Sequence, residues 1–408
     1  MNKTTKKTSQ QPLSDELATI IDNIDTREGI VSIAGHLLNS LMNKEREIFL
    51  RNQIEDNKAN GFYSRDIACN LGNLNLLVPR DRNSDFRSSV LPNHWQRGDD
   101  SYNEFLLNLI LQSYSPNKIK ALLKSMNLPY STEEIEEIKE DLFIKAKEFK
   151  NKQLTENIFA IFIDAYHTQI KDDENKIKTA VIYSIISIDL KGKKELCGFY
   201  TFFGSESKED WLVIFNNLIS RGLKRLALVI SDDFSGLKEA ISALFPRAKH
   251  QLCYIHMQRN IRRNMGKNDA KIFNEELSLI RKDKDKKSAL KRFENLCNEY
   301  RDKYQFYIEK LLAKKELYFN FIDFPEPIRK HIYTTNIVEN FNSRIEVKRI
   351  NSGGHFQSMK IVDIAIYVIG NNLHQNRWKN PIPAFKECEY EINQLFNLTF
   401  AKNAQFLD

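Results

Sequence analysis

The apolar run from Leu226 to Ile230 constrains the fold of this chain most, because it stops abruptly at Ser231-Asp232-Asp233. A helical pattern opens directly behind these acids. A buried strand that ends in carboxylates is unfavourable unless the charges face a crevice, and in open α/β sheets the crevice lies beyond the carboxyl ends of the strands. We therefore expect a strand here with functional Asp232 at its tip, and Asp233 as the N-cap of the following helix.

A second apolar run, Ile158 to Ile163, ends in the same way at Asp164. The elements expected after it are strands at Lys178–Ile188 and Glu195–Phe203, a helix at Glu209–Ser220, the strand at Leu226–Ile230, a helix at Gly236–Leu244 and a fifth strand near His250–Ile255. This βββαβα order matches a ribonuclease-H-like core, an α/β fold with a mixed sheet and helices on both faces. Its first and fourth strands are neighbours, so Asp164 and Asp232 should converge.

Two converging carboxylates repel each other, and a divalent cation is the usual resolution. Hard oxygen ligands favour Mg²⁺ or Mn²⁺. Glu339 supplies a third acid on a polar helix face that it shares with Asn336, Asn340 and Ser343. Three acids can hold two ions for in-line attack on a phosphodiester. The alternative is that Asp232 caps a helix, Asp164 forms a turn and Glu339 is a solvated surface residue.

The segment after the fifth strand holds further candidates. Cys253-x-x-His256 has the spacing of a zinc half-site, but no second pair of ligands follows, so support of the crevice or simple core packing is the preferred interpretation. Arg259, Arg262 and Arg263 form a basic ridge suited to phosphates, or alternatively a solvated helix face.

Arginines and aromatic residues alternate in the segment from 57 to 99. Arg65, Arg80 and Arg82 lie close to Phe62 and Tyr63, and such pairs suit a nucleic-acid backbone with exposed bases or sugars. A solvated, loop-rich hairpin is the alternative. Three helices are expected between 103 and 149, and the last two have helix-turn-helix spacing, although the third is too acidic to read a major groove convincingly.

These patterns divide the chain into five parts. We expect a disordered tail and helices at 1–56, a mainly helical DNA-binding region at 57–152, the catalytic core at 153–265 and 331–370, an all-helical insertion at 266–330 and a polar C-terminal tail at 371–408. A chain of 408 residues is too long for one compact core, so several domains are the natural expectation.

Charge and cysteine content narrow the compartment and the partners only modestly. The 61 Lys and Arg residues against 54 Asp and Glu residues give a net charge of +7, which favours a nucleic-acid partner slightly. Five scattered cysteines without a C-x-x-C pair predict a reducing compartment. The polar N-terminus predicts no signal peptide, and the apolar segment Ile361–Ile369 is too short to span a bilayer.

Several separated motifs now occur in one order along the chain. They are Gly61-Phe62-Tyr63-x-Arg65, Val78-Pro79-Arg80-Asp81-Arg82, Asp164-Ala165-Tyr166, Ser231-Asp232 with Gly236-Leu237-Lys238, Gln251-x-Cys253-x-x-His256-x-x-Arg259-Asn260, and Thr334-Thr335-Asn336-x-x-Glu339-x-x-Asn342 followed by Lys348 and Arg349. With these motifs the chain resembles a Mutator-type insertion-sequence transposase of the DDE class. One departure is Phe234, where the family usually has His.

The resemblance implies that Asp164, Asp232 and Glu339 are the catalytic, metal-binding triad, with two Mg²⁺ or Mn²⁺ ions. It implies binding to terminal inverted repeats and target DNA, strand cleavage and strand transfer, and a homodimer or higher oligomer on DNA. It also implies a prokaryotic, cytoplasmic protein at the nucleoid. Cys253, His256 and Asn336 would support the site, while Lys348 and Arg349 join the DNA-binding cations. Two alternatives remain, a ribonuclease-H-fold nuclease without strand transfer and a catalytically inactive DNA-binding protein.

Overall fold

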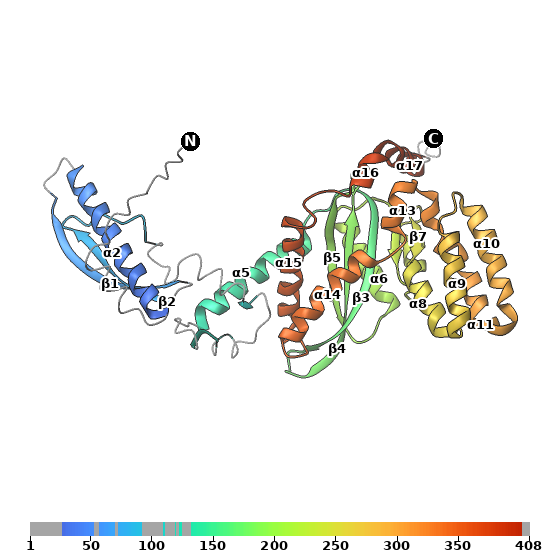
Figure 1. The fold of residues 1–408 in the computed structure, drawn as a ribbon, viewed down its shortest axis with the longest axis horizontal. Helices are drawn as coiled ribbons and strands as arrows, with labels where there is room; N and C mark the ends of the chain where they lie inside the picture. The colour runs from blue at the N-terminus through green and yellow to red at the C-terminus, as the bar shows by residue number, and fades with distance from the viewer. Residues whose placement is uncertain are drawn as a thin grey trace, which may run out of the picture. The chain divides into compact units, whose positions relative to one another are not determined.

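The computed structural model describes residues 27–52, 57–69, 72–91, 109–110, 119, 122–124 and 132–401. The helix expected from Ser14 and most of the expected helix-turn-helix lie outside these residues. The chain forms two compact units, Met1–Lys139 and Glu140–Asp408, and each is described by itself. Helix α5 (Thr132–Asn151) runs through the division between them (Figure 1).

The N-terminal unit packs a helix against a hairpin. Helix α2 (Arg27–Arg51) covers strands β1 (Ala59–Cys69) and β2 (Gly72–Asp81), which pair antiparallel. Leu74, Leu76 and Val78 alternate toward the helix and are buried with Met42, the two-residue period of a half-buried strand. The expected boundary at 56 therefore falls within one shared apolar core.

The second unit is built on a five-stranded mixed sheet. Its strands are β3 (Asn157–Lys171), β4 (Ile177–Ile188), β5 (Lys194–Phe203), β6 (Arg225–Ser231) and β7 (Lys249–Leu252). Their order is β5-β4-β3-β6-β7. The first three form an antiparallel meander, while β6 and β7 run parallel to β3. The mixed α/β fold predicted from the sequence is confirmed.

Apolar runs become strands here because helices cover both faces of the sheet. On one face, α6 (Lys208–Ser220) and α7 (Leu237–Leu244) bury residues such as Trp211 and Phe215. On the other face lie α8 (Tyr254–Asn264), α14 (Asn336–Asn351) and α15 (Met359–Gln375). The fifth strand ends at Leu252, three residues earlier than expected, because α8 already begins at Tyr254.

Helices fill the segment between α8 and α14, as its charged, apolar-periodic pattern predicts. They are α9 (Lys267–Ile280), α10 (Lys286–Glu299), α11 (Arg301–Ala313), α12 (Lys315–Tyr318), the 3-10 turn η1 (Asn320–Asp323) and α13 (Glu326–Ile332). Figure 1 shows α9, α10 and α11 gathered beyond β7. Phe273, Phe293 and Phe319 of this segment belong to the same apolar cluster as Phe159 and Phe162 of β3.

The segment after residue 371 differs from the polar tail expected there. It continues α15 and adds α16 (Pro383–Glu387) and α17 (Glu389–Ala401). Phe385 is buried against Phe159, with ring centroids 5.3 Å apart, and Ile392 is buried too. A few well-spaced apolar residues suffice to dock these helices, which an averaged polarity hides. Among the described residues, none of the helices has the length and apolar character needed to cross a membrane.

Candidate active site

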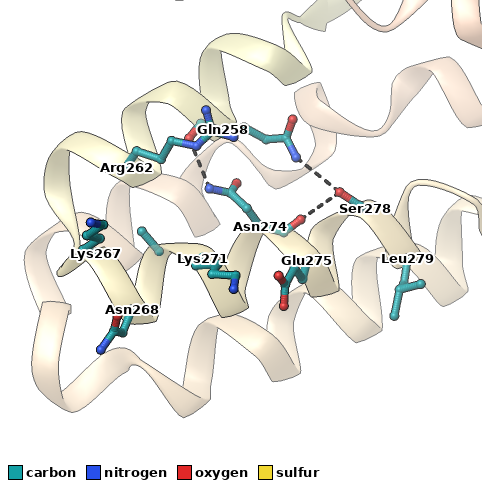
Figure 2. Close-up of a pocket in the computed structure, with 10 residues that line it drawn as sticks. Gln258, Arg262, Lys267, Asn268, Lys271, Asn274, Glu275, Ser278 and Leu279 are labelled. Atoms are coloured by element: carbon teal, nitrogen blue, oxygen red, sulfur yellow. Dashed lines mark hydrogen bonds between the residues drawn. The ribbon is translucent and has the colours of Figure 1, made fainter.

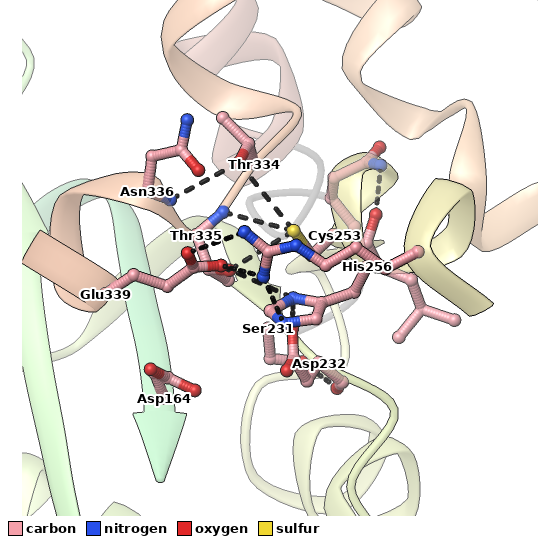
Figure 3. Close-up of polar contacts among 12 residues, drawn as sticks. Asp164, Ser231, Asp232, Cys253, His256, Thr334, Thr335, Asn336 and Glu339 are labelled. Carbon is pink, nitrogen blue, oxygen red and sulfur yellow. Dashed lines mark hydrogen bonds and ion pairs between the residues drawn. The ribbon is translucent and has the colours of Figure 1, made fainter. Parts of the chain in front are cut away.

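The register of β3 on β6 brings the two strand-end acids together. Ile163 lies opposite Ser231 in the parallel pair, so Asp164 and Asp232 are the next residues on adjacent strands. Strand β3 continues along β4 to Lys171, whereas β6 ends at Ser231. The acids therefore stand where β6 leaves the sheet, and Figure 3 shows them with Glu339 of α14 around one space.

Asp164 carries the least compensated charge of the three acids. Burial first, and then repulsion from Asp232 and Glu339, raise its pKa to about 6. Its only printed side-chain donor among the described residues is Asn342 of α14, whose Nδ2 lies 2.9 Å from Oδ2. Ser184 of β4 donates to Asn342 Oδ1 at 2.8 Å. This hydrogen bond fixes the amide so that its NH₂ group, and not its oxygen, faces Asp164.

Asp232 and Glu339 are held by two cationic or protonatable side chains of α8. His256 Nδ1 lies 2.5 Å from Asp232 Oδ1 and 3.6 Å from Glu339 Oε1. Arg259 donates to both oxygens of Glu339, each at 3.2 Å. It also lies with Nη1 2.9 Å from His256 Nε2. A ring protonated on Nδ1 alone satisfies both contacts, since it donates to Asp232 and accepts from Arg259.

The imidazole is nevertheless poised to hold a second proton. Burial lowers the pKa of His256, but hydrogen bonds to Asp232 and Cys253 outweigh burial and raise it. The guanidinium of Arg259 faces the remaining nitrogen and opposes that rise. Together the two α8 side chains place positive or donor groups at Asp232 and Glu339, whereas Asp164 has neither.

Cys253 joins the start of α8 to the start of α14. Its buried sulfur accepts hydrogen bonds from the Thr335 N–H at 3.4 Å and the Thr335 hydroxyl at 3.2 Å, and its own N–H donates to Ser231 O at 2.8 Å. Asp232 is the next residue after Ser231, and Glu339 lies one turn into α14. The sulfur thus links the backbone segments that carry two of the acids.

A second donor set also shares Asp232. One ligand atom each of Asp232, Cys253 and His256 lies within 4.8 Å of the other two. The zinc interpretation of Cys253-x-x-His256 lacked a further ligand in sequence, and the fold supplies Asp232 from β6. The sulfur is already engaged with Thr335, however, so the three carboxylates remain the better set of free oxygen ligands for a hard cation.

Asp233 and Asn336 lie away from the carboxylates. The expectation that Asp233 caps the following helix is wrong, because Gly236 is the N-cap of α7 and Asp233 instead pairs with Lys314. Asn336 is exposed on the first turn of α14, and Figure 3 shows its side chain directed away from Asp164. Phe234, in the position where the family usually has His, packs on Trp211 at 5.3 Å.

The predicted DNA-binding cations of the second unit fall in different surroundings. Arg259 is bound to Glu339, as described above. Arg262 lines a groove between α8 and α9 together with Lys267 and Lys271 (Figure 2). This cavity of about 780 Å³ is braced by Gln258, Asn274 and Ser278, which hydrogen-bond across the two helices. Arg263 is exposed near the end of α8.

The cations at the end of α14 are less exposed. Arg349 binds Glu346 through Nε at 2.7 Å and Nη2 at 2.6 Å, and it also donates to the Tyr166 hydroxyl and the Gly354 carbonyl. Arg349 and burial have opposing effects on Glu346, and its pKa falls to about 2. Burial lowers the pKa of Lys348. Arg349 is therefore part of a network that ties α14 to β3, a connection that sequence spacing did not reveal.

The remaining predicted cations belong to the hairpin of the N-terminal unit. Arg80 lies over the ring of Tyr63 at 5.4 Å, and Arg82 is exposed just after β2. Arg65 lies on β1 and is partly exposed. Arg46 of α2, absent from the sequence-based candidates, lies over Phe62 at 4.8 Å. It was missed because the apolar spacing of its helix indicated packing alone.

Comparison with known proteins identifies the family. The model of the Mutator family of transposases matches residues 4–380. The chain is 28% identical over 317 residues to the transposase of insertion sequence IS905 from Lactococcus lactis, covering 76% of this chain and 80% of that protein. It is 24% identical over 371 residues to a probable ISRM3-like transposase from Sinorhizobium fredii, covering 90% and 92%.

A further relative is the transposase of IS256 in transposon Tn4001 from Staphylococcus aureus, 27% identical over 71% of this chain and 75% of that protein. Among solved structures, a Drosophila P element transposase strand transfer complex aligns over 79% of this chain and 91% of that chain. Its identity is 13% and its TM-score 0.30, too low to establish a common fold. With the family model spanning nearly the whole sequence, the chain belongs to the Mutator family of insertion-sequence transposases.

Proposed function

We propose that Asp164, Asp232 and Glu339 are the metal-binding active centre with which this transposase cuts a DNA strand at the end of its element and joins it to target DNA. The observation that carries the proposal is the convergence of the three acids. Asp164 and Asp232 follow directly opposed residues of β3 and β6, and the charges of Asp232 and Glu339 both act on Asp164.

The strand order supports a ribonuclease-H-like core. An antiparallel meander of three strands, followed by two strands parallel to the first, places the first and fourth strands side by side at the centre of the sheet. In open sheets the ligand site lies at the carboxyl ends of such strands. The helices between α8 and α14 would then be an insertion that separates Asp232 from Glu339 in sequence and not in space.

The donor chemistry fits a hard divalent cation. Three carboxylates supply oxygen ligands, and Asp164 has a raised pKa because nothing balances its neighbours' charge. Asp164, Asp232 and Glu339 would hold two Mg²⁺ or Mn²⁺ ions, which when bound lower the pKa of water and neutralise charge on a reacting phosphate. Metal binding at Glu339 competes with Arg259, whereas Asn342 keeps one Asp164 oxygen oriented.

The substrate in this proposal is double-stranded DNA carrying the element's terminal inverted repeats. Arg65, Arg80 and Arg82 of the hairpin would contact the repeats, and the cations on α8 and α14 would contact DNA at the active centre. A second copy of the chain would bind the other end, giving a homodimer or higher oligomer. The bacterial sources of the relatives support action at the nucleoid of a prokaryotic cell.

The decisive test compares neighbouring acids. Asp232→Asn should abolish Mg²⁺-dependent cleavage of DNA that carries the element end while DNA binding persists. Asp233→Asn is the matched control and should keep cleavage, because Asp233 pairs with Lys314 outside the site. Cleavage at the wild-type rate by Asp232→Asn would refute the triad. A strand-transfer assay with pre-cut ends separates this proposal from a nuclease that only cleaves, since only a transposase joins the 3′ end to a second duplex.

A further inference from the structure

A cavity of about 580 Å³ on the flank of α14 is lined by positive charge alone. Three cations reach it from separate segments: Lys194 from the start of β5, Lys330 from α13 and Arg377 from the turn after α15. None of the residues that line it is an acid. Like charges gathered from three segments repel one another, so this arrangement is unfavourable without a ligand of opposite charge.

The three cations also have no acidic partner elsewhere. Among the residues that the structure describes, neither Lys194, Lys330 nor Arg377 forms an ion pair, whereas Lys150 binds Asp363 at 2.8 Å and Lys152 binds Glu195 at 2.5 Å. The chain thus neutralises other lysines of this unit with carboxylates and leaves these three side chains available.

The titratable groups in the cavity report the same uncompensated charge. Burial lowers the pKa of Lys194. Burial, then Lys330 and Lys194, lower the pKa of His331, and no carboxylate opposes them. His331 is consequently neutral at pH 7 and offers one N–H donor beside the cations.

Asn336 and Asn340 complete the donor set and locate it relative to the active centre. Both are exposed on α14 and line the cavity. They are three residues before and one residue after Glu339, hence within about 5 Å of it along the helix axis at about 1.5 Å per residue. Lysine, arginine and amide N–H groups are the donors that proteins present to the phosphates of a nucleic-acid backbone.

We propose that this cavity binds a backbone phosphate of the DNA strand whose neighbouring phosphate lies at Asp164, Asp232 and Glu339. The inference rests on the proposed function, which it deepens by giving the substrate strand a second point of attachment on α14. Lys194, Lys330 and Arg377 neutralise that phosphate, and Asn336 and Asn340 donate to its oxygens. The strand is then fixed on both flanks of the helix that carries Glu339.

The test neutralises single DNA phosphates and single protein cations in pairs. DNA carrying the element end is made with one methylphosphonate at a time along each strand near the cut. With wild-type protein, one such position should weaken binding about ten-fold, and with Lys194→Gln/Arg377→Gln the same position should make no further difference. The double variant should also lower the slope of log K against log salt by about one, the value for one lost phosphate contact.

Lys191→Gln and Lys379→Gln provide the matched controls, because both lysines are exposed close to the cavity residues in sequence and neither lines the cavity. Arg377→Lys should recover most of the affinity, and unchanged thermal unfolding excludes misfolding as the cause. If wild-type protein cleaves and no methylphosphonate position couples to the double variant, the phosphate site is refuted while the proposed function stands. If coupling is found but Mg²⁺-dependent cleavage is absent, the proposed function fails and the phosphate site stands.

A third arm separates the possible sources of the phosphate. Inorganic phosphate and a deoxynucleoside monophosphate are titrated against the wild type and the double variant by calorimetry. Tight binding of either small anion that is lost in the double variant, without coupling to any DNA phosphate, would assign the cavity to a free ligand and overturn its assignment to the DNA strand.

Discussion

The two flanks of α14 carry unbalanced charge of opposite sign. On one flank Glu339 stands with Asp164 and Asp232, and repulsion among them raises the pKa of Asp164. On the other flank Lys194 and Lys330 lower the pKa of His331. Elsewhere in this unit acids and bases pair with each other, as Lys249 and Asp323 do at 2.6 Å. Charge that the protein leaves unpaired marks the surface where a ligand must supply the balance.

The flanks also differ in how rigidly they are built. Sheet register and buried hydrogen bonds fix the acids, through Asn342 and Ser184 on one side and Cys253 on the other. The cations are flexible side chains from several segments around a cavity. Substitutions on the acidic flank should therefore have larger effects than substitutions on the basic flank.

Addition of a divalent cation should give the largest change in stability. Mn²⁺ at about one hundred times its dissociation constant should raise the free energy of unfolding by about 3 kcal/mol, because only the folded chain assembles the three acids. Glu339→Gln should lose most of this gain, and Asp233→Asn should keep it. Chemical unfolding with and without Mn²⁺ measures the effect, and equal stabilisation of all three proteins would place the metal elsewhere.

Asp164→Asn should stabilise the metal-free protein at pH 8 by about 2 kcal/mol. Folding raises the pKa of Asp164 from 3.8 to about 6, so its ionisation opposes folding above pH 6, and below about pH 4 the group is protonated in both states and makes no difference. Urea unfolding in EDTA at pH 8 and pH 4.5 should show the advantage shrink as pH falls. An advantage that is independent of pH would mean that repulsion among the acids is not its source.

The smallest effect should appear on the basic flank. Lys330→Gln should raise the pKa of His331 by a fraction of a unit, because one of the two cations that lower it is removed and burial remains. NMR titration of the imidazole measures this shift. Lys379→Gln should leave it unchanged, and a fall in the pKa after Lys330→Gln would contradict a positive field in the cavity.

The sequence predicts what depends on local pattern. Apolar runs at 158–163 and 226–230 indicate the strands and the acids at their tips, and the order of elements indicates that these strands are neighbours. The polar face around Glu339 indicates the third acid. Each of these features is written in consecutive residues, so period and punctuation suffice to find it.

What the sequence did not predict depends on contacts between distant segments. The pairing of Asp233 with Lys314 and of Arg349 with Glu346 and Tyr166 was not foreseen, since neither charge nor spacing distinguishes these partners from solvated residues. Asn342 was visible as part of a motif, yet its orientation depends on Ser184, 158 residues away. The cation cavity draws on several segments and leaves no local signal.

The helices between α8 and α14 share one apolar cluster with the sheet, from Phe273 and Phe293 to Phe159 and Phe341. Loosening these helices on heating would uncover the face of the sheet on which α14 rests, and Glu339 would move away from Asp164 and Asp232. The segment therefore sets a thermal ceiling for DNA cleavage. It also makes a protease cut within α9 or α10 as damaging to the distant carboxylates as a substitution among them.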